Sequence, residues 1–356
     1  MTPRFHRLAV ADVRRETPDA VSIAFAVPEA LREAYRFTPG QYLTLKTELG
    51  GEDIRRSYSI CSGLDEELRV AVKCVANGLF SSFANTALRP GDALDVMTPM
   101  GRFGLAPDPD AARTCVGLAC GSGITPVLSI LKSMLARESK SRFFLFYGNR
   151  TSRDIMFREA LEELKDRHMD RLSVFHVLSR EAQDIPVLNG RLDGAKISLL
   201  LRTVVPAAVV DHAFICGPGT MIEEAEATLK ALGVPGEIHI ERFTPAEGAA
   251  GRPVSRPVPA DAPPRALAEI VLDGRRYTVP VGEDEGIVDA ALRAGLELPY
   301  ACKGGMCCTC RAKIVEGRVE MRTNYSLEPW EIEAGYALTC QARPITERVV
   351  VDYDQV

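Results

Sequence analysis

Four cysteines near the C-terminus share a spacing that few folds can accommodate. They read C-x4-C-x2-C followed by a distant fourth cysteine, at Cys302, Cys307, Cys310 and Cys340. This is the spacing of thiolates that hold a [2Fe-2S] cluster, with three ligands on one tight loop and one from elsewhere. Gly304 and Gly305 would let this loop curl and point amide N–H groups at the sulfurs. The spacing therefore predicts a domain that carries single electrons.

Two other uses of these cysteines are weaker. A structural zinc site usually contains two C-x2-C pairs, and only Cys307 and Cys310 form one. Disulfides form in oxidising compartments, and residues 1–7 lack the apolar segment of a signal peptide, so we expect a cytoplasmic protein. Cys308 lies between Cys307 and Cys310, at a position that the ligand spacing does not use. We therefore interpret it as a thiol that does not bind the cluster.

Composition indicates a globular chain of about two or three domains. The chain has 356 residues, of which 46% are hydrophobic and 26% charged. Its one long apolar run, residues 116–131, is interrupted by Gly117, Gly121, Gly123 and Pro126, so we expect no membrane span. The net charge of −5 gives no support to nucleic-acid binding.

The pattern along the chain predicts three domains and a linker. Residues 1–108 contain short β-rich runs at 20–27, 41–46, 57–61 and 68–75 without helical periodicity, which favours an antiparallel β-barrel. Residues 109–244 alternate apolar and helical stretches, which is typical of a parallel α/β nucleotide-binding sheet. Six prolines make residues 245–265 a linker.

Residues 266–356 predict a β-grasp domain around the cysteine loop. Residues 267–272 and 277–281 read as a hairpin that turns at Asp273-Gly274. An apolar stripe then predicts a helix capped by Asp284 and ended by Gly295, just before the loop.

A glycine-rich turn follows the first apolar run of the α/β region. Its residues are Gly121, Ser122, Gly123, Ile124, Thr125 and Pro126. The glycines would admit a pyrophosphate to the backbone, and the helix that follows would offer its N-terminal N–H groups. Such turns occur in many α/β proteins, so the motif alone is not specific.

Other segments make the chain similar to the ferredoxin-NADP reductase family. Arg56-Ser57-Tyr58-Ser59 resembles its R-x-Y-S motif, where arginine pairs with the FAD pyrophosphate, tyrosine packs on the isoalloxazine and serine lies near flavin N5. Residues 72–81 resemble its second FAD segment, which departs from the family at Asn77, where glycine is usual. The resemblance implies FAD contacts from Val72, Lys73, Gly78, Leu79, Phe80 and Ser81.

The same resemblance implies a hydride-transfer site. Cys216-Gly217-Pro218 resembles the C-G-P motif, whose cysteine lies beside the nicotinamide. For a lone cysteine at a strand end, core packing would be the better explanation. Glu241 and Phe243 match the segment that lies near the flavin. The resemblance thus implies that Ser59, Cys216 and Glu241 are catalytic.

Two loops predict the choice of nucleotide. Asn149, Arg150, Ser179 and Arg180 follow two predicted strands, where related enzymes contact the 2′-phosphate. Cationic side chains suit a 2′-phosphate, whereas NAD sites prefer an acidic residue, so we favour NADPH over NADH. The alternative is that these are ordinary solvated arginines.

Over its whole length the chain resembles the reductase subunits of phenylacetyl-CoA epoxidases. The segments concerned are residues 29–37, 147–152, 298–305 and 323–329. This resemblance implies electron flow from NADPH through FAD and the [2Fe-2S] cluster to a diiron oxygenase of that complex. Two alternatives stay open: a reductase for another aromatic-ring oxygenase or hydroxylase, and a non-catalytic electron carrier or redox sensor.

Overall fold

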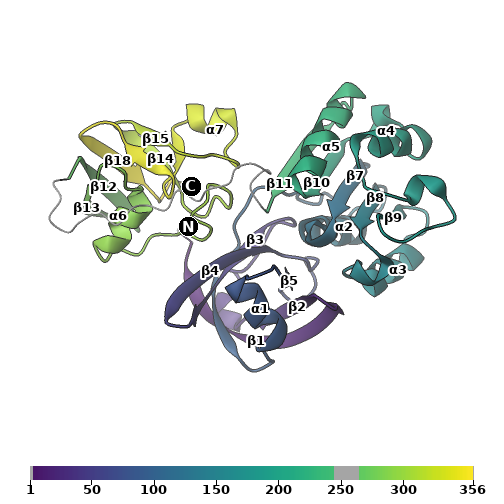
Figure 1. Ribbon diagram of the computed structural model, residues 1–356, viewed down its shortest axis with the longest axis horizontal. Coiled ribbons are helices and arrows are strands. Elements are labelled where there is room, and N and C mark those ends of the chain that lie inside the picture. Colours follow the sequence, from purple (N-terminus) through teal and green to yellow (C-terminus); the bar gives the residue numbers. More distant parts are fainter. Residues whose placement is uncertain (1–2, 244–263, 356) are drawn as a thin grey trace. The chain divides into compact units, whose positions relative to one another are not determined.

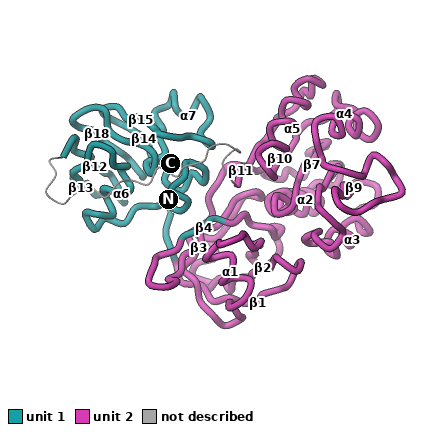
Figure 2. Tube along the Cα trace, viewed as in Figure 1, with its two compact units in different colours: residues 1–5, 55–57, 247–356 teal, residues 6–54, 58–246 magenta. Residues whose placement is uncertain are grey.

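The computed structural model describes residues 3–243 and 264–355. The chain divides into two compact units (Figure 2): residues 6–54 and 58–246 form one, and residues 1–5, 55–57 and 247–356 form the other. The predicted linker, residues 245–265, lies outside the described residues except for its last two positions. The predicted domain boundaries stay a prediction.

An antiparallel barrel forms the first part of the larger unit, as the sequence predicted. Its strands run in the order β4-β3-β6-β1-β2-β5, and a bridge between Ile60 and Val70 joins the two ends of this order. The strands are β1 (Phe5–Thr17), β2 (Ala20–Ala26), β3 (Tyr42–Leu49), β4 (Glu52–Ser59), β5 (Arg69–Lys73) and β6 (Ala93–Met97).

The barrel region also contains a helix that the sequence analysis did not identify. Helix α1 (Leu79–Thr86) follows β5 and buries Phe80 and Ala84 against the barrel core. At eight residues it is too short to display a clear helical period in the sequence. Asn85 holds it in place, because its side-chain amide donates to the carbonyl of Val72 at 3.1 Å.

A parallel five-stranded sheet forms the rest of the larger unit, in the order β11-β10-β7-β8-β9. Helices α2 and α3 share one hydrophobic core with it, and α4 and α5 share the core on its other face (Figure 1). The predicted α/β architecture is confirmed. The elements are β7 (Thr114–Cys120), α2 (Ile124–Arg137), β8 (Arg142–Asn149), α3 (Arg158–Arg167), β9 (Leu172–Leu178), α4 (Gly194–Thr203), β10 (His212–Gly217), α5 (Gly219–Ala231) and β11 (Glu237–Arg242).

The strand order reverses between β7 and β10, and in open parallel sheets ligands bind at the carboxyl ends of strands at such a point. The glycine turn occupies this position, since a short 3-10 turn (Gly121–Gly123) leads from β7 into α2. Pro126 lies in the first turn of α2, where its missing N–H costs nothing.

The smaller unit contains a mixed sheet of order β13-β12-β18-β14-β16 with α6 packed into its core, and a separate β15-β17 pair. The predicted hairpin is present, with positive φ at Asp273 (52°) and Gly274 (70°). The elements are β12 (Ala266–Leu272), β13 (Arg275–Val281), α6 (Ile287–Arg293), β14 (Arg311–Glu316), β15 (Val319–Met321), α7 (Pro329–Glu333), β16 (Tyr336–Leu338), β17 (Ala342–Pro344) and β18 (Arg348–Asp352).

The predicted cap of α6 was wrong. Gly286 occupies the N-cap position, and the Asp284 carboxylate instead accepts a hydrogen bond from Arg343 at 2.8 Å. Gly295 does follow the helix end, in a left-handed conformation with φ of 77°. Among the described residues, no helix is long and apolar enough to span a membrane.

Candidate cofactor and catalytic sites

The three predicted catalytic residues meet at the carboxyl end of the parallel sheet. Cys216 on β10 is the direct neighbour of Glu241 on β11 in the parallel register. Ser59, the last residue of β4, donates its hydroxyl to Glu241 Oε2 at 3.2 Å. The fold thus joins a barrel strand to two sheet strands through residues that lie 182 positions apart in the chain.

Burial dominates the electrostatics of this cluster. It raises the pKa of the Glu241 carboxyl to about 8, although the hydrogen bond from Ser59 acts in the opposite direction. Burial also raises the pKa of the Cys216 thiol well above its ordinary value, and the nearby Glu241 adds to this shift. At neutral pH the carboxyl is therefore protonated and the cysteine is a thiol, which suits packing and shaping rather than nucleophilic attack.

The R-x-Y-S residues occupy the last four positions of β4. Arg56 donates to the carbonyl of Arg55 at 2.7 Å, which fixes part of its guanidinium. The ring of Tyr58 lies 5.4 Å from that of Phe80 on α1, with an angle of 34° between the planes. The barrel therefore brings the two predicted FAD segments together at one end of α1.

The turn before α1 has the form of an anion cradle. Asn77 adopts the left-handed conformation that glycine usually supplies, with φ of 60°. The Ser81 hydroxyl accepts from the Val75 amide and donates to the Gly78 carbonyl, both at 3.1 Å. A Cβ at Gly78 would lie 2.4 Å from Ser81 Oγ, so the site requires glycine. This turn at a helix N-terminus fits a phosphate group.

Three other members of the second FAD segment lie beside this turn. Val72 is buried near the end of β5, and Lys73, the last residue of this strand, forms an ion pair with Asp19 at 3.5 Å. Leu79 begins α1 and is exposed.

The nucleotide candidates surround the point where the sheet order reverses. A Cβ at Gly123 would lie 2.1 Å from the carbonyl oxygen of Cys216, so the glycine turn packs directly on the C-G-P segment. A Cβ at Gly217 would lie 2.4 Å from Met221. The Thr125 hydroxyl closes the turn by donating to the Ser122 carbonyl at 2.9 Å. The result is a surface of bare backbone that fits a pyrophosphate.

The two loops of the nucleotide prediction lie side by side. The Ser179 amide donates to the Asn149 carbonyl at 3.0 Å, and the Arg180 amide donates to the Arg150 carbonyl at 2.8 Å. Both arginine side chains are exposed, and neither forms an ion pair with any residue that the structure describes. The Tyr147 hydroxyl connects these loops to the glycine turn by donating to the Gly121 carbonyl at 2.9 Å.

The four cluster cysteines gather on one side of the smaller unit. The amides of Gly304 and Cys307 donate to Cys302 Sγ at 3.3 and 3.4 Å. The thiols of Cys302 and Cys307 lie within hydrogen-bonding reach of each other, as do those of Cys310 and Cys340. Hydrogen bonds from Cys307 and from backbone amides lower the pKa of Cys302 to about 5. A thiolate held by N–H donors fits a [2Fe-2S] cluster.

Backbone strain shapes this loop. Lys303, Gly305 and Cys308 all have positive φ, at 47°, 75° and 54°. At Gly305 a Cβ would also approach the Thr323 carbonyl to 2.9 Å. Left-handed residues curl the chain tightly, so the ligands come from a short segment.

The sequence analysis missed the residues that support the cysteines. Gln341 donates to the Lys303 carbonyl at 2.8 Å and lies 3.7 Å from Cys340 Sγ. Thr339 donates to the Cys310 carbonyl at 2.7 Å. Both residues flank Cys340 in the chain, and this adjacency was the only feature of the sequence that could have indicated their supporting role. Cys120, at the end of β7, was also missed; a Cβ at Gly148 would lie 2.5 Å from its sulfur.

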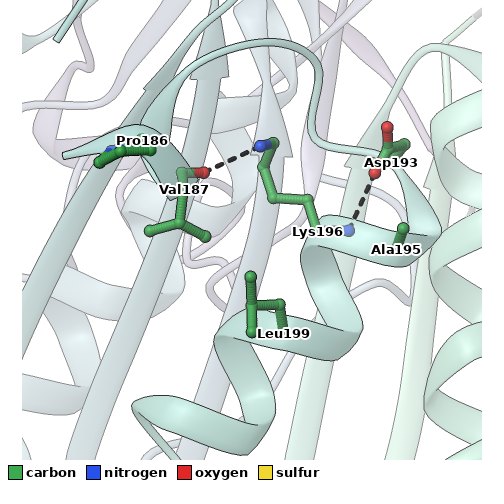
Figure 3. Close-up of a pocket in the computed structure, with 6 residues that line it drawn as sticks. All are labelled: Pro186, Val187, Asp193, Ala195, Lys196 and Leu199. Carbon is green, nitrogen blue, oxygen red and sulfur yellow. Dashed lines mark hydrogen bonds between the residues drawn. The ribbon is translucent and has the colours of Figure 1, made fainter.

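Phe243 belongs to the predicted flavin residues, whereas the lining of a surface hollow contains none of the predicted site residues. Phe243 directly follows β11 and is 40% exposed. The hollow, about 590 Å³, lies on α4 (Figure 3). Its one amine, Lys196 Nζ, already donates to the carbonyls of Val187 and Asn189. No predicted site residue lines it. Its lining is Pro186, Val187, Asp193, Ala195, Lys196 and Leu199.

Three family models match consecutive parts of the chain. They are described as "Oxidoreductase FAD-binding domain" (residues 7–104), "Oxidoreductase NAD-binding domain" (residues 118–227) and "2Fe-2S iron-sulfur cluster binding domain" (residues 270–344). Each match contains the residues that the sequence analysis assigned to the corresponding cofactor, apart from Glu241 and Phe243, which follow the second match.

Known proteins resemble the chain along nearly its full length. One subunit of the 1,2-phenylacetyl-CoA epoxidase of Escherichia coli (strain K12) is 50% identical, over 98% of each chain. The ferredoxin reductase component of the 3-ketosteroid-9-alpha-monooxygenase of Mycobacterium tuberculosis is 36% identical, over 98% of this chain and 96% of its own. Phthalate dioxygenase reductase has the same fold, with a TM-score of 0.57 at 22% identity and 98% coverage of both chains.

The raised pKa of Glu241 predicts how the stability of the larger unit depends on pH. Between its ordinary pKa of 4.5 and about 8, the folded protein retains a proton that the unfolded chain releases. Stability should therefore fall as pH rises through this window, by on the order of a few kcal/mol, since one pKa unit is worth about 1.4 kcal/mol. In Glu241→Gln this loss should disappear.

The effect is measured by thermal unfolding of the holoprotein at pH 6, 7, 8 and 9. Unfolding is monitored by the rise in flavin fluorescence as the flavin is released. Glu223→Gln, an exposed glutamate on α5, is the control and should keep the wild-type slope. Equal slopes in wild type and Glu241→Gln would show that the carboxyl is ionised in the folded protein.

Proposed function

This chain belongs to the family of oxidoreductases that pass electrons from NAD(P)H through FAD to a [2Fe-2S] cluster, and we propose that it serves the oxygenase of a phenylacetyl-CoA epoxidase. The observation that carries the proposal is 50% identity to one subunit of such an epoxidase over 98% of both chains. The acceptor is a diiron centre, and the complex works in the cytoplasm during aerobic phenylacetate breakdown.

The proposed domains follow the sequence boundaries. Residues 1–108 bind FAD, and residues 109–244 bind the nucleotide. Residues 245–265 link the nucleotide-binding domain to residues 266–356, which carry the cluster. When bound, the flavin and the cluster supply the conversion of a hydride into single electrons. The protein contributes binding, orientation and the exclusion of water.

The FAD site is built from two segments. Arg56 holds the pyrophosphate, Tyr58 packs on the isoalloxazine, and Ser57 lines the site through the same strand. The turn at Gly78 and Ser81, with Val72, Lys73, Leu79 and Phe80, completes it. The cradle at the N-terminus of α1 supports this assignment.

The nucleotide lies on the glycine turn and the C-G-P segment. Gly121, Gly123, Gly217 and Pro218 offer bare backbone, and Ile124, Thr125 and Pro126 begin the helix that receives the pyrophosphate. Cys216 shapes the nicotinamide position, Ser59 and Glu241 lie at the flavin, and Phe243 covers that site. The direct Ser59–Glu241 hydrogen bond and the Cys216–Glu241 pairing support these roles.

The cluster assignment predicts opposite results for two neighbouring cysteines. Cys302→Ser should lose the iron and all oxygenase support, yet keep NADPH-driven ferricyanide reduction at the flavin, because the sites are in separate domains. Cys308→Ser, the matched control, should keep its iron and its EPR signal after reduction. Loss of ferricyanide reduction in a folded Cys302→Ser protein would contradict the separation of sites, and loss of iron in Cys308→Ser would contradict the ligand set.

The preference for NADPH rests on Asn149, Arg150, Ser179 and Arg180. The double variant Arg150→Gln/Arg180→Gln should raise the KM for NADPH roughly tenfold or more, since hydrogen bonds to charged groups contribute about 1.5–3 kcal/mol. The KM for NADH should not change. Arg153→Gln, an exposed arginine in the same loop, is the control. Equal effects on both nucleotides would mean that these arginines do not read the 2′-phosphate.

The partner is tested by reconstitution. NADPH consumption is measured with the oxygenase subunits of a phenylacetyl-CoA epoxidase, with and without phenylacetyl-CoA, beside a cytochrome c assay. We expect consumption that depends on the substrate and is coupled to product. Cytochrome c reduction without such coupling would indicate that the partner is another oxygenase. The oxygenase of a 3-ketosteroid-9-alpha-monooxygenase would then be tested first, because its reductase component is 36% identical to this chain. Failure in both assays would indicate a non-catalytic electron carrier.

A further inference from the structure

Three side chains with metal-binding atoms converge at the amino ends of β10 and β11. His212 Nδ1 lies 3.2 Å from His239 Nε2 and 3.8 Å from Glu237 Oε2, and His239 Nε2 lies 3.5 Å from the same Glu237 oxygen. The three form a compact triangle of two imidazole nitrogens and one carboxylate oxygen.

The register of the two strands produces this triangle. His212 pairs with Glu237 across the parallel strands, and Phe214 pairs with His239. Side chains two apart on a strand share a face, so His212 and Phe214 point the same way, as do Glu237 and His239. The cluster therefore belongs to the sheet and not to a mobile loop.

The separations match those of a tetrahedral zinc site. Ligand bonds of about 2.0–2.2 Å at tetrahedral angles place neighbouring ligand atoms roughly 3.3–3.6 Å apart. The separations of 3.2, 3.5 and 3.8 Å bracket this range. Two histidines and one glutamate are also a known zinc ligand set, with the fourth position left to water.

Aromatic packing holds the two imidazoles in place. The His239 ring stacks on Phe214 with centroids 4.8 Å apart and planes at 12°, and the two histidine rings stack at 5.4 Å and 29°. Their side chains are only 17% and 18% exposed. Burial lowers the pKa of both histidines, so they are neutral at neutral pH, which is the form that binds metals.

The charges around the triangle are mixed but include more acids than bases. Arg113 lowers the pKa of His212 further, and this cation opposes metal binding. Three acids raise the pKa of the same histidine, namely Glu237, Asp211 and Glu138. The Arg113 guanidinium also lies 3.8 Å from the Glu138 carboxylate, which offsets part of its charge.

We propose that His212, Glu237 and His239 form a binding site for one transition-metal cation of the Zn²⁺ class. The site is separate from the four cluster cysteines and lies at the strand ends opposite to Cys216 and Glu241. A bound cation would fasten the start of β11 to β10. Glu241 lies two residues beyond His239 on the same face of β11, roughly 7 Å along the strand.

Zinc binding to the oxidised holoprotein tests the proposal. Equilibrium dialysis against ZnCl₂, with zinc, iron and flavin measured in each sample, should give one zinc per flavin at unchanged iron content. His212→Gln/His239→Gln should weaken this binding tenfold or more, since even residues that only support metal ligands affect affinity by 10–100-fold. His168→Gln, a histidine outside the cluster, should bind zinc as the wild type does.

Copper provides a second measurement, because the oxidised cluster and oxidised flavin give no EPR signal. One equivalent of Cu²⁺ should show nitrogen hyperfine structure in the wild type and in His168→Gln, but not in the double variant. If that variant does not fold, Glu237→Gln replaces it in the zinc measurement, since the exposed Glu237 can be changed without disturbing the core. This variant keeps both imidazoles, so we expect weaker zinc binding and not the loss of nitrogen hyperfine structure. Equal zinc affinity in wild type and in the cluster variants would overturn the proposal and leave a hydrogen-bonded histidine pair.

Discussion

The parallel pairing of β10 with β7 on one side and β11 on the other is the constraint on which the larger unit depends. It places the glycine turn after β7 against the last residues of β10, so closely that Gly123 has no room for a Cβ. It also sets Glu241 beside Cys216, and the hydrogen bond from Ser59 then ties the barrel to the same point. A shift of one residue would turn Glu241 to the other face of the sheet and leave a buried hydroxyl without its acceptor.

The cysteine loop depends on a different constraint, which is local backbone geometry. Three residues with positive φ curl it, and Gln341 and Thr339 anchor it from the segment that brings in Cys340. These supports come from the smaller unit itself. The cysteine loop therefore depends on the fold of the smaller unit, whereas the flavin and nucleotide candidates depend on the sheet and barrel.

The sequence predicted what local chemistry determines. The Asp273-Gly274 turn and the glycine turn are each specified within a few residues, and the structure contains both. Helix α1 was missed because eight residues give too short a period, and the cap at Asp284 failed because Arg343, distant in the chain, binds that carboxylate. The Ser59–Glu241 contact and the histidine triangle depend on strand register, which no local pattern specifies.

The protonation state of Glu241 bears on the balance of the proposed reaction. A hydride carries two electrons and one proton, so a protein that accepts a hydride and gives up only electrons must also release a proton. Ser59 is buried, Glu241 is half-buried, and the two are hydrogen-bonded to each other. The Glu241 pKa of about 8 lets this carboxyl hold or release a proton near neutral pH. An ordinary exposed glutamate would be ionised throughout this range and could not donate one. Burial at the meeting point of barrel and sheet, and not the hydrogen bond from Ser59, thus gives Glu241 a capacity that an exposed glutamate lacks.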